Sequence, residues 1–264
     1  MDPDTLDTIG IYDFEGQLTS RTFTAHPKFD FATGEMMGYG LEAKGLNSND
    51  LVYYRFNKEG KKVDECWGRH LTAPPQEKFV RFKINPKSPS DEMELPVVLS
   101  DIPGEMARND DRYQTNPYTH AYAATPGDMG FGGILHVNHA TGLSKVWRAG
   151  DGVGVGEPCF VPRSPDAPEG DGYLVVCVRD GKTTLAHLAI LDTEDITRGP
   201  VGVIELPFRL REGVHGSWVN ASDRKDRQPL VDYSGVTPEI LAEFGTGAPK
   251  PYDKLPDVPV KIIR

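Results

Sequence analysis

The sequence predicts an all-β fold, and three observations support that prediction. Its apolar runs are short, of strand length, and rich in β-branched and aromatic residues. Turn signals that contain glycine separate these runs at the spacing expected of hairpins. Helical patterns are sparse, whereas the 264 residues include 28 glycines and 22 prolines. Repeated hairpins of this kind favour a propeller or a sandwich, although no clean sequence repeat is visible.

Six segments have the length and composition of strands. They are residues 51–56, 79–84, 133–137, 173–178, 185–191 and 201–206. Four turn signals lie before, between or after them, at Thr33-Gly34, Glu59-Gly60, Thr141-Gly142 and Asp180-Gly181. Because glycine and aspartate tolerate the left-handed backbone of a tight turn, we expect antiparallel neighbours at these positions. In the last segment, alternation places Val201, Val203 and Glu205 on one face.

Only two short segments carry a helical signal. Residues 237–245 are the better case, because Thr237 can cap the first turn and Pro238 suits the first helical position. Residues 195–198 can form a single turn. The proline-rich tail, residues 247–259, is expected to lie extended on the surface.

Charge and composition exclude several classes of protein. The 39 acidic residues outnumber the 29 basic ones and give a net charge of −10, which argues against a nucleic-acid partner or an anionic membrane partner. The longest apolar run, residues 173–178, is too short to span a bilayer, and the acidic start of the chain does not resemble a secretion signal. Cys66, Cys159 and Cys177 are odd in number and far apart, which suits a reducing compartment. We therefore predict a cytoplasmic protein with no transmembrane segment, and its oligomeric state is left open.

Histidines are the candidate metal ligands, and two of the seven lie in distinctive surroundings. His26 comes just before Pro27, which fixes the backbone beside the ring, and His215 lies between glycines that permit a close approach. We expect His70 and His120 to be isolated, solvated loop histidines and His187 to be an ordinary strand histidine. His136 and His139 flank a predicted hairpin, and a metal role for them is disfavoured. The chain has no HExxH, CxxC, phosphate-binding loop or GxSxG motif.

Two glutamates lie in similarly tight surroundings. Glu105 and Glu157 each follow a glycine, and Glu157 is itself followed by a proline. A metal-bound imidazole usually donates its other N–H group to a carboxylate, so such glutamates can orient metal histidines. Composition alone gives this group of four residues little weight.

Several motifs in order along the chain resemble the carotenoid cleavage oxygenase family. They are Thr-Phe-Thr-Ala-His-Pro-Lys-Phe-Asp at residues 22–30, residues 99–108 around Glu105, Gly-Glu-Pro-Cys-Phe-Val-Pro at residues 156–162, and His-Gly-Ser-Trp at residues 215–218. Residues 12–17 and 40–45 are most similar to the lignostilbene dioxygenase branch of the family. The resemblance extends over nearly the whole chain.

This resemblance implies a seven-bladed β-propeller with Fe(II) on its axis, held by four histidines. Members, among them relatives of the retinal pigment epithelium retinoid isomerase, mostly cleave an alkene of a carotenoid, apocarotenoid or stilbene into two carbonyl products with O₂. On the resemblance, His26 and His215 take the places of the first and fourth iron ligands. Glu105 and Glu157 take the places of two glutamates that orient ligand histidines. Imidazole suits Fe(II), and four of them leave two octahedral positions open.

The chain departs from the family pattern in two places. After residues 65–67 the family places its second histidine, whereas here the chain continues into a stretch that resembles a later part of the family. A block that carries the second and third iron histidines is therefore expected to be absent, with a junction near residues 67–70. On the resemblance, we also expect the chain to begin inside the family pattern, after the part that carries the third orienting glutamate. We expect a single incomplete propeller domain over residues 1–264, with residues 1–68 around the first histidine, residues 69–264 forming the C-terminal blades, several blades missing and few short helices.

Three functions are compatible with these observations. The first is a non-haem Fe(II) dioxygenase, an oxidoreductase acting on a small apolar or phenolic alkene and O₂, with impaired activity because only two of four ligands remain. The branch resemblance favours a phenolic stilbene substrate over a carotenoid. The second is a non-catalytic β module that binds a partner or an apolar ligand. The third, disfavoured because no acid partner or nucleophile motif accompanies it, is a β-sandwich hydrolase that uses His215 and Ser217.

Overall fold

A computed structural model describes residues 7–10, 12–69, 78–85, 87–88, 93–183, 185–206, 210 and 213–220, and the backbone of residues 231–232 and 261–262. The chain divides into two compact units, Met1–Asp101 with Arg112–Tyr118, and Ile102–Asp111 with Thr119–Arg264. Helical structure in the described residues is limited to two 3₁₀ turns, η1 (Asp111–Tyr113) and η2 (Ile196–Arg198). The all-β prediction is therefore confirmed, whereas the assignment of one domain stays a prediction. None of the described segments forms a helix with the length and apolar character that a membrane crossing requires.

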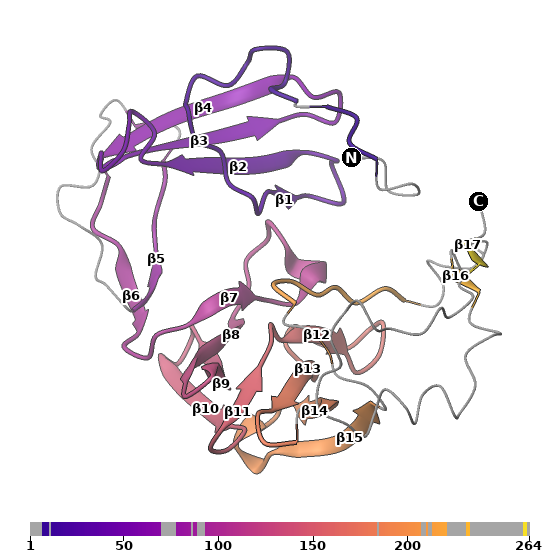
Figure 1. The fold of residues 1–264 in the computed structure, drawn as a ribbon. Helices are drawn as coiled ribbons and strands as arrows, with labels where there is room; N and C mark the ends of the chain where they lie inside the picture. Colours follow the sequence, from indigo (N-terminus) through magenta and orange to yellow (C-terminus); the bar gives the residue numbers. More distant parts are fainter. Residues whose placement is uncertain are drawn as a thin grey trace. The chain divides into compact units, whose positions relative to one another are not determined.

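The first unit is built on a four-stranded antiparallel sheet (Figure 1). Its strands lie in the order β1 (Lys28–Phe29), β2 (Met36–Leu41), β3 (Asp50–Phe56) and β4 (Lys62–Arg69). A separate two-stranded sheet pairs β5 (Phe79–Arg81) with β6 (Val97–Ser100). The predicted turns join β1 to β2 and β3 to β4, where Gly34 and Gly60 adopt φ angles of 74° and 76°. These left-handed backbones explain why both turns need glycine.

Alternation along β3 builds the core of the first unit. Val52, Tyr54 and Phe56 are buried on one face of the strand. The chain that precedes β1 packs over them, and Phe14 stacks on Phe56 with ring centroids 4.2 Å apart. The Tyr54 hydroxyl accepts a hydrogen bond from the backbone N–H of Ser20 at 2.9 Å. These contacts hold the segment that leads to His26 against the sheet.

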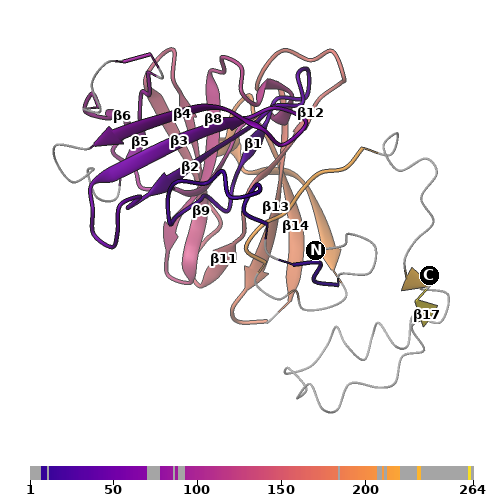
Figure 2. The ribbon, with the colours of Figure 1, turned by 90° about the horizontal axis from the view of Figure 1, so that it is seen from above.

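The second unit contains two larger antiparallel sheets (Figure 2) and one two-stranded sheet. One has the order β10 (Leu143–Arg148), β9 (Gly130–Asn138), β8 (His120–Gly127) and β7 (Glu105–Arg108). The other has the order β11 (Val153–Val155), β13 (Gly172–Asp180), β14 (Ala186–Asp192) and β15 (Pro200–Leu206), with β12 (Cys159–Pro162) also paired to β13. Beyond them, β16 (Val231–Asp232) pairs with β17 (Lys261–Ile262).

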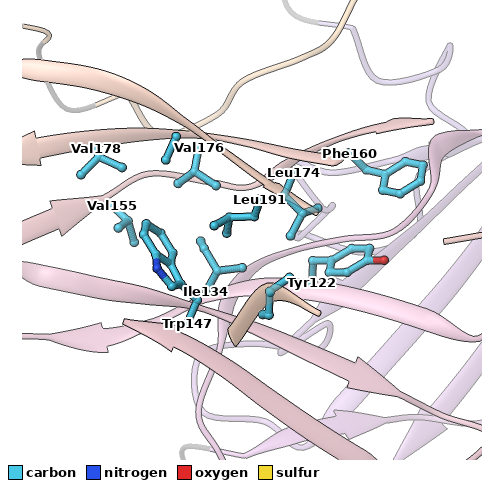
Figure 3. Packing of buried hydrophobic residues seen from close by; sticks show 11 residues of the cluster. Tyr122, Ile134, Trp147, Val155, Phe160, Leu174, Val176, Val178 and Leu191 are labelled. Atoms are coloured by element: carbon cyan, nitrogen blue, oxygen red, sulfur yellow. The ribbon is translucent and has the colours of Figure 1, made fainter. Parts of the chain in front are cut away.

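The core of the second unit lies between its two sheets. Figure 3 shows Tyr122, Ile134 and Trp147 of the first sheet facing apolar side chains of the second. Those side chains are Val155, Phe160, Leu174, Val176, Val178 and Leu191. Face-to-face packing of twisted antiparallel sheets is the arrangement of neighbouring propeller blades.

The predicted strands largely correspond to observed ones, but several observed strands were not predicted. The segment expected at residues 79–84 pairs only over Phe79–Arg81. Strands β2, β4 and β8 were missed because they contain glycine, charged residues or alanine, and they form because neighbouring strands satisfy their backbone groups. The turn expected at residues 195–198 is η2, capped by the Asp195 side chain. The helix predicted at residues 237–245 and the tail at residues 247–259 lie outside the described residues.

Candidate metal centre

His215 and Glu157 meet in the second unit although 58 residues separate them in sequence. Glu157 lies between β11 and β12, and its side chain is only 6% exposed. Its Oε1 atom lies 3.2 Å from Nδ1 of His215, so the imidazole N–H donates to the carboxylate. This bond places the imidazole proton on Nδ1 and the lone pair on Nε2 of His215, and the imidazole is half exposed.

The second oxygen of Glu157 is also occupied. Its Oε2 atom accepts the backbone N–H of Gly216 at 2.9 Å and lies 3.4 Å from Nη1 of Arg108. A buried carboxylate costs free energy unless hydrogen bonds and a counter-charge compensate it, and both are present here. The two oxygens therefore have separate roles, Oε1 toward the histidine and Oε2 toward the backbone and the arginine.

Glu105 occupies an exposed position on the same unit. It lies on β7 opposite Ala124 of β8. Within the described part of the chain, its side chain makes no hydrogen bond or ion pair, so no polar contact joins it to His215 of the same unit. The expected role of Glu105 in orienting a histidine stays a prediction.

His26 belongs to the first unit. It lies in the irregular segment just before β1, and its side chain is exposed. The backbone N–H of His26 donates to the Thr24 hydroxyl at 3.0 Å, which closes a tight local turn before Pro27. The structure thus presents the His26 imidazole at the surface of the first unit, while His215 belongs to the second.

His120 is not the isolated loop histidine that the sequence predicts. It begins β8, and its Nδ1 lies 2.8 Å from Nε2 of His136, which is buried on β9. The expectation for His120 was wrong because strand pairing places it opposite Asn138, next to the β9 histidine. Burial lowers the pKa of His136 to about 4, and the neighbouring His120 adds to the effect. His70 lies outside the described residues.

The structure supplies one feature that the hydrolase alternative lacked, an acid partner for His215. An acid partner for His215 does exist, since Glu157 binds its Nδ1, and the expectation that none accompanies it was wrong. Ser217 nevertheless makes no hydrogen bond to His215 in the described segment 213–220, and no strained nucleophile turn surrounds it. The nearby thiol of Cys159 is also a poor nucleophile, because burial raises its pKa.

The donor set of the second unit fits a metal histidine. An imidazole whose Nδ1 is held by a buried carboxylate presents Nε2 in a fixed tautomer, and imidazole nitrogen suits Fe(II). Among the described residues, however, no group of three or more His, Cys, Asp or Glu side chains is placed to hold a metal ion. The sequence analysis did not single out Arg108, which contacts Glu157 here, and its only signal was its place three positions after Glu105 in a family motif.

Comparison with known proteins finds relatives that are named as oxygenases. The sequence profile of a family described as retinal pigment epithelial membrane protein matches residues 1–75 and 67–220. Carotenoid cleavage oxygenase 1 of Neurospora crassa is 30% identical over 351 residues, which cover 84% of this chain and 66% of the relative. Isoeugenol monooxygenase of Pseudomonas nitroreducens is 28% identical and covers 83% of this chain and 70% of the relative. The chain spans about two thirds of the length of these relatives.

Solved structures show the same fold. The lignostilbene dioxygenase of Pseudomonas brassicacearum matches with a TM-score of 0.61 and 26% identity, over 83% of this chain and 70% of that chain. A cobalt-substituted Synechocystis enzyme matches with a TM-score of 0.55 over 84% and 70%, and its 17% identity supports the fold alone. The alignment with the N. crassa relative has 351 positions, but only 84% of this chain, about 222 residues, takes part in it. About 130 positions of the alignment therefore have no residue of this chain opposite them. The two family matches overlap at residues 67–75.

Proposed function

The chain belongs to the retinal pigment epithelial membrane protein family, and on that premise we propose that it carries part of a non-haem Fe(II) dioxygenase centre. The proposed ligands in this chain are His26 and His215, with Glu157 and Glu105 as orienting carboxylates. The reaction is cleavage of an alkene into two carbonyl products with O₂. When bound, Fe(II) would supply the centre at which O₂ reacts with the alkene.

The hydrogen bond between His215 and Glu157 is the observation that carries this proposal. Nδ1–H of His215 donates to Oε1 at 3.2 Å, and Gly216 N–H holds the other oxygen at 2.9 Å. A solvated surface histidine has no need of a nearly buried carboxylate, whereas a metal histidine uses one to fix its tautomer and raise its basicity. The local geometry therefore favours a ligand role for His215 over a structural one.

We further propose that the chain as it stands is impaired. The overlap of the two family matches at residues 67–75 supports a missing internal block at that point, and so does the excess length of the N. crassa alignment. With two histidines, the chain offers fewer ligands than the two-histidine, one-carboxylate set of many Fe(II) oxygenases. Weak iron binding and low turnover are the expected consequences.

The substrate class proposed is a phenolic alkene. Relatives named for resveratrol, isoeugenol and lignostilbene support this class, although the N. crassa relative is named for carotenoids. A cytosolic location also stays a prediction, supported by the three unpaired cysteines.

Metal binding by substituted chains tests the ligand assignment. Fe(II) affinity should fall at least tenfold in His26→Ala and in His215→Ala, and about 10- to 100-fold in Glu157→Gln, because the orienting carboxylate is lost. His187→Ala is the matched control, since His187 is a half-buried histidine of the second unit, on β14 and outside the candidate site. If both histidines bind one ion, the double substitution should weaken binding by less than the product of the single effects. Unchanged affinity in His215→Ala contradicts the ligand role.

Iron content and product release test the impairment. Anaerobically loaded protein should hold clearly less than one iron per chain and release aldehyde from isoeugenol or a hydroxystilbene only slowly. One iron per chain together with rapid aldehyde release contradicts the proposed impairment, and this result leaves the assignment of the ligands unaffected.

A non-catalytic binding module is the second candidate. The observation that favours it is β15, an edge strand on which Val201 and Val203 are 61% and 52% exposed. An edge of this kind can pair with an added strand. Metal affinity that depends on His215 supports the oxygenase assignment over this alternative.

A further inference from the structure

Arg108 joins three separate parts of the second unit. Its Nη1 atom donates to the Gly216 carbonyl at 3.1 Å and lies 3.4 Å from Oε2 of Glu157. Its Nη2 atom donates to Asp111 at 3.2 Å. We propose that Arg108 is a positioning residue, which holds Glu157 and the backbone of Gly216 in one hydrogen-bonded group and so directs His215; the importance of this for catalysis rests on the proposed function.

A β-bulge aims Arg108 at this group. Glu105 pairs with Ala124, and Arg108 pairs with Tyr122. Between these two pairs, β7 contains one residue more than β8. Met106 absorbs the extra residue with a φ of 53°, a left-handed backbone that is rare for a side chain of this size. Without the bulge, residues three apart would point to opposite faces of the sheet.

The bulge therefore turns the Arg108 side chain to the face that Tyr122 occupies. Tyr122 packs against the second sheet, with its ring centroid 5.9 Å from that of Phe160. Glu157 lies in the connection between β11 and β12, two strands of that second sheet. Strained backbone is kept where the surrounding contacts require it, and here the contact it permits is the one between Arg108 and Glu157.

The Arg108 guanidinium also determines which oxygen of Glu157 accepts the hydrogen bond from His215. Arg108 and Gly216 N–H both approach Oε2 of Glu157, which leaves Oε1 to the imidazole. Because the guanidinium is planar and has several fixed donors, it can bind Glu157, the Gly216 carbonyl and Asp111 together. A lysine ammonium is a compact charge whose three donors rotate at the end of a flexible stem, so it cannot reproduce that planar geometry.

Three readouts on substituted chains test the proposal. The ¹⁵N shifts of the His215 imidazole report whether the proton is on Nδ1, and amide exchange at Gly216 reports how firmly the segment is held. Binding of Co²⁺ as a probe metal is the third. The variants are Arg108→Gln and Arg108→Lys, and Arg163→Gln is the matched control, because Arg163 forms ion pairs with Asp171 and Asp192 in the same unit.

The expected result is specific to Arg108. Arg108→Gln should shift His215 toward the Nε2–H tautomer, raise exchange at Gly216 about fivefold to tenfold, and weaken Co²⁺ binding. Arg108→Lys, which is the safer variant for folding, should fall between Arg108→Gln and the wild type. Arg163→Gln should leave all three readouts unchanged.

Other results overturn the proposal. An unchanged tautomer and unchanged Gly216 exchange in Arg108→Gln show that Arg108 does not position His215, and equal effects of Arg163→Gln show a non-specific loss of stability. If Arg108→Lys keeps all three readouts at their wild-type values, a positive charge at this position is enough and the planar geometry of the guanidinium is not required. If His215→Ala leaves Co²⁺ binding unchanged, the metal function fails, and the tautomer measurement still decides the role of Arg108.

Discussion

Acid should destabilise the second unit through His136. This residue is only 7% exposed, its ring stacks on Tyr122 with centroids 4.9 Å apart, and its Nε2 is bonded to His120. Among the residues that the structure describes, no partner lies within hydrogen-bonding distance of its Nδ1 atom. A second proton on the ring would therefore be buried without an acceptor, close to the positive charge of Lys145 and with only partial relief from Asp195.

The size of the effect follows from the lowered pKa. Burial brings the pKa of His136 to about 4, whereas the unfolded chain has the ordinary histidine value of about 6.5. Above pH 6.5, His136 is neutral in both the folded and the unfolded chain, so the difference between its two pKa values does not change the free energy of unfolding. Below that pH the unfolded state takes up a proton that the folded state does not, so the free energy of unfolding falls by about 1.4 kcal/mol for each pH unit. By pH 4 the loss amounts to about 3 kcal/mol.

Urea unfolding from about pH 7.5 down to pH 4.5 measures this loss. His136→Phe keeps an aromatic ring against Tyr122 but cannot titrate, so it should lose less stability than the wild type as the pH falls, with a difference of roughly 2 to 3 kcal/mol at the acid end. Carboxylates that titrate in the same range cancel in this comparison. His187→Phe is the control and should follow the wild type. Parallel curves for the wild type and His136→Phe would refute the reasoning.

Two further substitutions test the packing of the second unit by urea unfolding. Gly170→Ala should destabilise it by at least 2 kcal/mol, because Gly170 has a φ of 75° and an added Cβ would collide with the His120 ring. Gly142→Ala, with a φ of 70° and open space around it, should cost only about 1 kcal/mol, and equal losses would show that the collision is unimportant. Leu174→Ala should cost about 2 to 5 kcal/mol because Leu174 is fully buried between the sheets. Leu143→Ala, at a residue 63% exposed, should stay within about 0.5 kcal/mol, and similar losses at the two leucines would contradict the assigned core.

Local sequence patterns predicted much of the fold. The apolar runs that became β3, β9, β13 and β14 are recognisable because β-branched and aromatic side chains suit a sheet whatever its partners. Strand β4 was not recognised, because its charged and half-buried residues give no clear alternation. Its strand form comes from pairing with β3, a contact that its own composition does not encode.

The candidate site was predicted less completely. The resemblance to a known family pointed to His215 and Glu157, and the fold brings these two together. It could not indicate that Arg108 completes the group, because that depends on a one-residue bulge at Met106. Nor could it show that His120 is paired with a buried histidine, since isolated histidines in sequence carry no sign of their burial.

By itself, the sequence determined the all-β class, the positions of the glycine turns and the motifs that carry His26, Glu105, Glu157 and His215. Those features are local, since they depend on side-chain shape, backbone freedom and the order of short motifs. Only the tertiary structure decided that Glu157 faces His215 and that Arg108 holds them. Such contacts join residues about 50 to 110 positions apart, so they exist only once strand pairing and burial have brought distant segments to one place.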